Sequence, residues 1–169
     1  MQKKIGMVSH GCPKNQVDAE IMLNRLKEAG FEITGDAAKA DAVIINTCGF
    51  IEDAKKEAIE NILELAELKK ESNLKGLIVT GCLAERYKDE VITEMPEIDA
   101  IVGIGANEDI VDVINRVIDG EGGISKFADK DKLDMDSDRI LASPRYTAYL
   151  RIADGCDNCC TYCTIPKAR

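Results

Sequence analysis

The sequence predicts an α/β protein with a mostly parallel sheet flanked by helices, in a flavodoxin-like or Rossmann-like arrangement. Short, continuous apolar runs, such as residues 42–47 and 77–80, have the pattern of strands that are buried on both faces. Segments with apolar residues at helical spacing lie between these runs, so strands and helices alternate along the chain. This alternation favours right-handed crossovers and parallel strand pairing.

The first half of the chain supplies three predicted strands. A buried strand is predicted at residues 4–9, and apolar residues at helical spacing follow it as far as Gly30, where a helix would stop. Residues 31–34 are a short strand candidate at one edge, which would place the first, third and fourth strands side by side. The link between residues 34 and 41 is shorter than a usual parallel crossover, so we expect the second strand to be vestigial or irregularly paired.

The second half continues the alternation. A helix, a strand, a helix, a strand and a helix are predicted in turn at about residues 52–71, 77–80, 84–95, 100–103 and 107–120. The first of these helices is amphipathic, and its buried face is expected to hold Ala58, Ile59, Ile62, Leu65 and Ala66.

The composition changes after Gly120. Residues 121–146 contain two adjacent glycines, several aspartates and few apolar residues, which is typical of a linker. The alternating run at residues 148–152 predicts a strand that begins a second domain. We therefore expect one domain at residues 1–120, a linker at 121–146 and the start of a truncated second domain at 147–169.

Charge and hydropathy exclude some classes of protein. The formal net charge of −9 disfavours a free-standing nucleic-acid binder and fits a cytoplasmic protein. No apolar run approaches the roughly 18 residues of a membrane span, and none resembles a signal peptide. Seven cysteines in a chain without a secretory signal indicate metal binding or catalysis rather than disulfides.

Three of the cysteines follow predicted strands. Cys12, Cys48 and Cys82 each lie just past the carboxyl end of a buried strand, beside a glycine. Neighbouring strands lie about 4.8 Å apart, so the three thiols should converge at the edge where open α/β sheets bind ligands. A single cysteine in such a place is more often a small buried apolar residue. Three in the same placement favour a cluster with one open iron.

The other four cysteines lie within eight residues near the end of the chain. Three of them have the spacing Cys156-x3-Cys160-x2-Cys163, and three thiolates on one tight loop can hold three irons of a cubane cluster and leave the fourth open. Cys159 is then left over. The alternative is a four-cysteine zinc site, but with no spacer between the two pairs the thiolates would struggle to surround one metal tetrahedrally.

Four motifs together resemble the methylthiotransferases, which are radical S-adenosylmethionine enzymes with an additional amino-terminal cluster domain. The motifs are Gly11-Cys12-Pro13-Lys14-Asn15, Asn46-Thr47-Cys48, Gly81-Cys82, and Cys156-x3-Cys160-x2-Cys163 with Ile165-Pro166. Pro13 and Lys14 are similar to the members that modify an aspartate of a small-subunit ribosomal protein. The tRNA-modifying members typically carry Cys-Gln-Met-Asn at this place.

The resemblance implies two 4Fe–4S clusters and S-adenosylmethionine as cofactors. One cluster would bind S-adenosylmethionine at its open iron, and its ligands would be Cys156, Cys160 and Cys163. The other would be held by Cys12, Cys48 and Cys82. Tyr162 matches the aromatic position that lies beside the adenine of S-adenosylmethionine, and no acid–base catalytic residue is implied.

The implied activity is the insertion of sulfur and a methyl group at an unactivated C–H bond. The substrate would be a ribosomal protein or, alternatively, tRNA, and the electron donor a protein such as flavodoxin or ferredoxin. We expect a cytoplasmic monomer whose residues 147–169 begin a radical S-adenosylmethionine barrel. Because the resemblance implies that the rest of this barrel is needed, the 169 residues alone are expected to be catalytically inactive. Two alternatives of another class are an iron–sulfur electron-transfer protein and a zinc-binding structural module.

Overall fold

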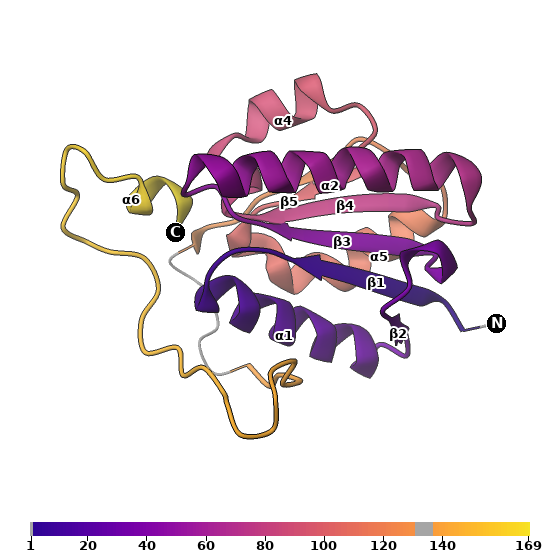
Figure 1. Cartoon of the computed structure of the whole chain (residues 1–169), viewed down its shortest axis with the longest axis horizontal. Coiled ribbons are helices and arrows are strands. Elements are labelled where there is room, and N and C mark those ends of the chain that lie inside the picture. Colours follow the sequence, from indigo (N-terminus) through magenta and orange to yellow (C-terminus); the bar gives the residue numbers. More distant parts are fainter. Residues whose placement is uncertain (1, 131–136) are drawn as a thin grey trace.

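The computed structural model describes residues 2–130 and 137–169, which form an α/β fold around one parallel sheet (Figure 1). The sheet has six strands in the order β2-β1-β3-β4-β5-β6, and every neighbouring pair is parallel. The strands are β1 (Lys4–Ser9), β2 (Glu32–Thr34), β3 (Ala42–Thr47), β4 (Gly76–Gly81), β5 (Ala100–Val102) and β6 (Ile124–Lys126). The predicted parallel sheet, with the first, third and fourth strands side by side, is confirmed.

Helices cover both faces of the sheet. Figure 1 shows α1 and α5 on one face and α2 and α4 on the other. The helical elements are α1 (Pro13–Glu28), η1 (Ala37–Lys39), α2 (Glu52–Glu71), α3 (Cys82–Arg86), α4 (Lys88–Glu94), η2 (Ile104–Asp109), α5 (Ile110–Ile118) and α6 (Ile165–Ala168).

The core is divided between the two faces by the two-residue period of the strands. Ile44 and Ile78 pack with residues of α1 and α5, whereas Val43, Ile45 and their neighbours in β4 pack against α2 and α4. Both β3 and β4 are buried along their whole length, which explains why their sequences are continuous apolar runs.

Several helical details differ from the prediction. The helix α2 has the predicted bounds, but Ile59 on it is exposed rather than buried. The helix after β4 starts earlier than expected, at Cys82, and is interrupted at Tyr87, which caps both α3 and α4. The Tyr87 backbone has left the helical region there, so one predicted helix becomes two short ones.

The second strand pairs regularly. β2 follows β1 in parallel register over three residues, and the short crossover to β3 is made by η1 instead of a full helix. The Asp36 carboxylate accepts a hydrogen bond from the Ala38 N–H and so caps this turn. A single 3-10 turn is therefore enough to lead the chain from β2, across β1, to β3 on its other side.

The segment predicted as a linker contains a sixth strand. β6 pairs with β5, and the Gly103 N–H donates to the Lys126 carbonyl. Ile124 is buried, and its N–H donates to the Asp99 carbonyl. One buried side chain among glycines and aspartates is too weak a pattern to predict this strand from the sequence.

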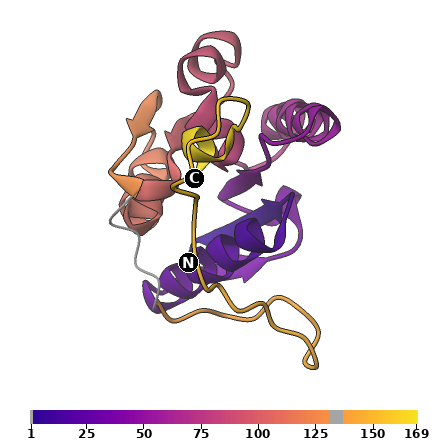
Figure 2. The same cartoon turned by 90° about the vertical axis from the view of Figure 1, so that its left-hand side faces the viewer.

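The strand predicted at residues 148–152 is wrong: these residues are described, and none of them is in a strand. Leu150 and Ile152 are 83% and 86% exposed, and no strand in the described part of the chain pairs with this segment. The predicted opening of a barrel is therefore not seen. Figures 1 and 2 show this segment running past α1 and ending in α6, beyond the carboxyl ends of the strands. No helix in the described ranges is long and apolar enough to cross a membrane.

Candidate metal centre

The first three cysteines lie around one cavity at the carboxyl edge of the sheet. Cys12 caps the start of α1 after β1, Cys48 follows β3, and Cys82 begins α3 directly after β4. All three line a cavity of about 470 Å³. Cys48 and Cys82 are each 7% exposed, and Cys12 is exposed. The three adjacent strands thus bring together the side chains that the sequence placed at their ends.

Glycines allow the three cysteine loops to approach one another. Gly11 has a φ of +104°, and a Cβ on it would lie 2.9 Å from the Cβ of Cys48. Gly81 has a φ of +93°, and its Cβ would lie 2.6 Å from Oδ1 of Asn46. A larger residue at either position would both adopt a strained backbone and push a cysteine loop away.

Asn15 is the side chain that connects the loops. It is buried, and its Nδ2 donates to the carbonyls of His10 and Thr47, at 2.9 Å each. Its Oδ1 lies 3.6 Å from Sγ of Cys82. One amide therefore contacts the loop before Cys12, the residue before Cys48, and Cys82 itself.

The lining of the cavity would shield a bound group from water. Apart from the cysteines and two cationic residues it is mainly apolar, with side chains from Phe50, Ile51, Ala54, Ile165 and Ala168. Burial raises the pKa of the Cys82 thiol, and the charge of Arg169 opposes this rise. Three thiolates are a soft donor set, which suits an iron–sulfur cluster or zinc. The donor chemistry of the three cysteines therefore fits an iron–sulfur cluster. Within the described part of the chain, no three histidine, cysteine or acidic side chains are placed to hold a single metal ion.

The second cysteine set does not line this cavity. Cys156, Cys159 and Cys160 are exposed and Cys163 is half-buried, on a tight loop in which the Cys163 N–H donates to the Cys160 carbonyl at 2.9 Å. Tyr162, predicted to contact S-adenosylmethionine, is exposed. The ends of this loop do reach the cavity, because residues 155, 165, 168 and 169 contribute to its wall.

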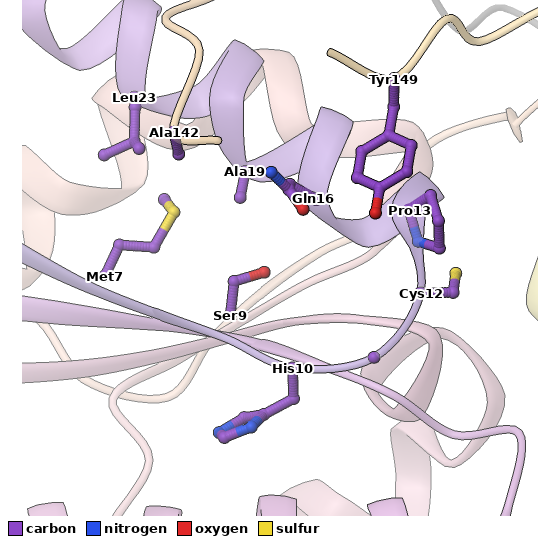
Figure 3. Close-up of a pocket in the computed structure, with 11 residues that line it drawn as sticks. Met7, Ser9, His10, Cys12, Pro13, Gln16, Ala19, Leu23, Ala142 and Tyr149 are labelled. Carbon is purple, nitrogen blue, oxygen red and sulfur yellow. The ribbon is translucent and has the colours of Figure 1, made fainter. Parts of the chain in front are cut away.

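A second cavity lies on the other side of Cys12. It has a volume of about 400 Å³. Figure 3 shows Gln16 on α1 and Tyr149 beside it; Tyr149 belongs to residues 137–169, which we call the tail. His10 points to the opposite side of its loop in this view, and its Nδ1 lies 3.3 Å from Oε1 of Glu57 on α2. His10 therefore lines this cavity, while its imidazole lies against Glu57 on α2.

A buried group of charges near the cysteines is absent from the sequence-based prediction. Asp18 on α1 pairs with Arg151 and Arg169, and Asp154 pairs with Arg169 at 3.1 Å. Arg151 and Asp18 are 133 residues apart in the chain. No local pattern marks charged residues whose partners are so distant, so only the fold could reveal them.

The comparisons with known proteins agree with the resemblance seen in the sequence. The model of the uncharacterized protein family UPF0004 matches residues 4–103. The chain is also similar to several proteins named ribosomal protein uS12 methylthiotransferase RimO, including the following three. That of Desulforamulus reducens is 52% identical over 98% of this chain and 37% of its own length. That of Caldicellulosiruptor saccharolyticus is 51% identical over 98% and 38%, and that of Clostridioides difficile is 50% identical over 98% and 37%.

The matched region includes all of β1 to β5 and the three cysteines around the cavity. The similarity to the RimO methylthiotransferases extends over nearly the whole chain, while the chain spans less than two fifths of the length of these relatives. On the match to its sheet and cysteine loops, the chain belongs to the UPF0004 family, with RimO methylthiotransferases among its relatives.

Proposed function

We propose that this chain carries the two iron–sulfur sites of a methylthiotransferase that modifies an aspartate of ribosomal protein uS12. The observation that carries the proposal is the convergence of Cys12, Cys48 and Cys82, from three strand ends, on one largely apolar cavity. Three thiolates held by three separate loops form a ligand set that none of the strands could provide alone.

The chain's own residues divide the work between two sites. Cys12, Cys48 and Cys82 would hold one 4Fe–4S cluster. The other cluster, with S-adenosylmethionine on its open iron, would be held by Cys156, Cys160 and Cys163. When bound, these cofactors supply the radical chemistry that an unactivated C–H bond requires and that acid–base side chains cannot provide.

Other side chains would orient and shield these groups. Asn15 would fix the separation of the three loops around the cavity, and Phe50 and Ile51, which line it, would cover the bound group. Tyr162 would lie beside the adenine of S-adenosylmethionine. Cys159 has no assigned ligand role, which makes it a control for the other cysteines.

The substrate assignment rests on the names of the relatives and on Pro13 and Lys14. Each relative described above is named as a uS12 methylthiotransferase. We therefore favour uS12 over tRNA as the substrate. We further propose a cytoplasmic monomer that receives electrons from a protein such as flavodoxin or ferredoxin.

The proposed substrate is tested by deleting the gene in its host. We expect mass spectrometry to show that the methylthio group is lost from uS12, while the methylthiolated nucleosides of tRNA are unchanged. The wild-type gene and a Cys159→Ala variant should restore the modification, and a Cys12→Ala variant should not. Loss of the tRNA modification with uS12 intact would assign the protein to tRNA instead.

Binding of S-adenosylmethionine separates the proposal from the electron-transfer and zinc alternatives. Anaerobically reconstituted protein should bind S-adenosylmethionine in calorimetry, and a Cys156→Ala, Cys160→Ala, Cys163→Ala variant should not. Absence of binding to the iron-loaded wild type would favour the electron-transfer protein, since such a protein has fully ligated clusters.

A further inference from the structure

Four buried charged side chains connect α1 to the two ends of the Cys156 loop. Nη1 of Arg151 lies 2.9 Å from Oδ1 of Asp18, and Nη1 of Arg169 lies 2.7 Å from Oδ2 of the same carboxylate. Oδ2 of Asp154 lies 3.1 Å from Arg169. The two arginine side chains are 5% exposed, and the two aspartates are also buried. We call these four residues the Asp18 cluster.

The cluster pairs two arginines with two aspartates, so its formal charges balance when all four members are present. Burial raises the pKa of Asp18, and the charge of Arg169 opposes this rise. Burial alone would lower the pKa of Arg169, but the charges of Asp18 and Asp154 raise it, and the guanidinium stays charged. Buried ion pairs contribute little net stability, whereas removing one partner leaves an uncompensated buried charge. The main effect of such a cluster is therefore to fix the relative positions of the segments that carry its four residues.

These segments also carry cysteines of the two sets. Asp18 lies on α1, the helix that Cys12 caps, whereas Arg151 and Arg169 lie on either side of the loop that carries the other cysteines. Both ends of that loop are thus attached to the same carboxylate. Lys14, also on α1, adds a peripheral pair with Asp154 at 3.4 Å.

A second attachment on α1 holds the chain before this loop. Glu20 is buried, and its Oε1 accepts a hydrogen bond from the Ala142 N–H at 2.9 Å. The Glu20 carbonyl accepts from the Ile140 N–H, and Arg139 lies 3.5 Å from Glu20 Oε2. Asp18 and Glu20, two residues apart on α1, therefore hold the tail at two separate points.

The tail in turn covers part of the three-cysteine cavity. Nη2 of Arg169 donates to Oδ1 of Asn15 at 2.5 Å, so the Asp18 cluster is directly linked to the amide that connects the cysteine loops. Ala168 packs in a small apolar group with Cys82 and Ile104. Seating of the tail therefore decides how accessible the Cys82 thiol is.

We propose that Asp18 is a positioning residue that, through Arg151 and Arg169, seats the two segments flanking the 156–163 loop against the cavity formed by Cys12, Cys48 and Cys82. If the proposed function is correct, this contact also holds the two clusters at a fixed separation, and that part of the inference rests on the proposed function. The contact between the tail and the cavity is independent of it, because it requires no metal.

The test uses the metal-free chain and the nearly isosteric Asp18→Asn variant, which removes the charge and keeps a similar shape. We expect amide hydrogen exchange of residues 151–169 to accelerate about tenfold or more, because two buried arginines lose one of their carboxylates. Alkylation of Cys82, followed by peptide mass spectrometry, should accelerate to a similar extent. Exchange in β3 and β4 should be unchanged.

Two further variants complete the experiment. Asp112→Asn removes one of the two exposed partners that Arg116 has among the described residues, and it should alter neither measurement. Arg169 lies outside the sheet core, so Arg169→Gln tests the same cluster without threatening the fold. It should reproduce the faster hydrogen exchange of Asp18→Asn; alkylation is not compared, because Arg169 also affects the pKa of Cys82.

Unchanged exchange of the tail in Arg169→Gln, or faster exchange throughout β3 and β4 in both variants, would overturn the proposal. Iron content is measured separately on reconstituted protein. A tail that is seated as described in a chain that binds no iron would therefore refute the proposed function and leave the positioning role standing.

Discussion

At the scale of single residues, Asn15 is the side chain on which the three-cysteine cavity depends most. Its amide hydrogens satisfy the carbonyls of His10 and Thr47 in a buried environment. We expect Asn15→Ala to lower the free energy of unfolding by about 2–3 kcal/mol, because two buried carbonyls lose their donor. Urea denaturation of the metal-free chain measures this loss.

The matched control is Asn61→Ala. Asn61 is half-buried on α2, and its amide donates a solvent-exposed hydrogen bond to the Glu57 carbonyl one turn earlier. We expect its replacement to change the free energy of unfolding by less than about 0.5 kcal/mol. Equal effects of the two substitutions would show that Asn15 does not hold the loops together.

Asp41 predicts a pH dependence of stability. Burial alone would raise its pKa, but the Lys4 backbone N–H, at 2.8 Å, and the Lys75 ammonium hold the pKa below its ordinary value of 3.8. A lowered folded-state pKa contributes stability that is present above pH 3.8 and is lost as the pH falls through the folded-state value.

We therefore expect Asp41→Asn to reduce the free energy of unfolding at neutral pH by about 1–2 kcal/mol, with the difference from the wild type shrinking in acid. Denaturant titrations at a series of pH values check this. The exposed Asp112→Asn variant should follow the wild type at every pH. A penalty for Asp41→Asn that is independent of pH would contradict the role given to its charge.

The cysteines of the candidate site could be predicted from the sequence, and the charges around them could not. Cys12, Cys48 and Cys82 each follow a recognisable strand, so strand order alone brings them together. Asp18 lies on a helix whose other residues give no sign that a carboxylate is buried there, and its partners belong to a segment more than 130 residues away. The role of the cysteines as metal ligands, and that of Asp18 as a positioning residue, stay predictions.

At the scale of elements, the close contact between β3 and the start of α3 depends on Gly81. Its φ is +93°, and a Cβ there would lie 2.7 Å from the Thr47 nitrogen and 2.6 Å from Oδ1 of Asn46. We expect Gly81→Ala to cost more than about 3 kcal/mol, because backbone strain is added to a clash with β3. It should also increase the alkylation rate of Cys82.

Gly30→Ala is the control for backbone strain alone. Gly30 has a similar φ of +88°, but nothing lies within 4 Å of the position of its Cβ. We expect a cost of about 1–2 kcal/mol from the left-handed conformation. If the two alanine variants were equally stable in denaturant titrations, close packing at Gly81 would play no part.

The elements that the sequence predicted well are the long ones with a strong period. The twenty residues of α2 carry a repeating apolar face, and their bounds were predicted correctly. By contrast, β6 has three residues and one buried side chain. The run at residues 148–152 alternates like a strand but finds no partner among the described residues. A strand exists only where another strand pairs with it, and periodicity alone does not show that.

At the scale of the whole molecule, the fold places two sets of cysteines at one end of the sheet by different means. The sheet itself positions Cys12, Cys48 and Cys82, through strand order and tight glycine-containing loops. The 156–163 loop is positioned by ion pairs to α1, with no strand of its own. We therefore expect the first set to be held rigidly and the second to depend on the Asp18 cluster.

The most direct test of the two-site account is the content of iron, sulfide and zinc per chain after anaerobic reconstitution. The wild type and a Cys159→Ala control should each contain about eight irons, as two 4Fe–4S clusters require. Replacement of Cys12, Cys48 and Cys82 by alanine should remove about four irons, and replacement of Cys156, Cys160 and Cys163 should remove the other four. Stoichiometric zinc in place of iron, or iron content unchanged in the first triple variant, would contradict the account.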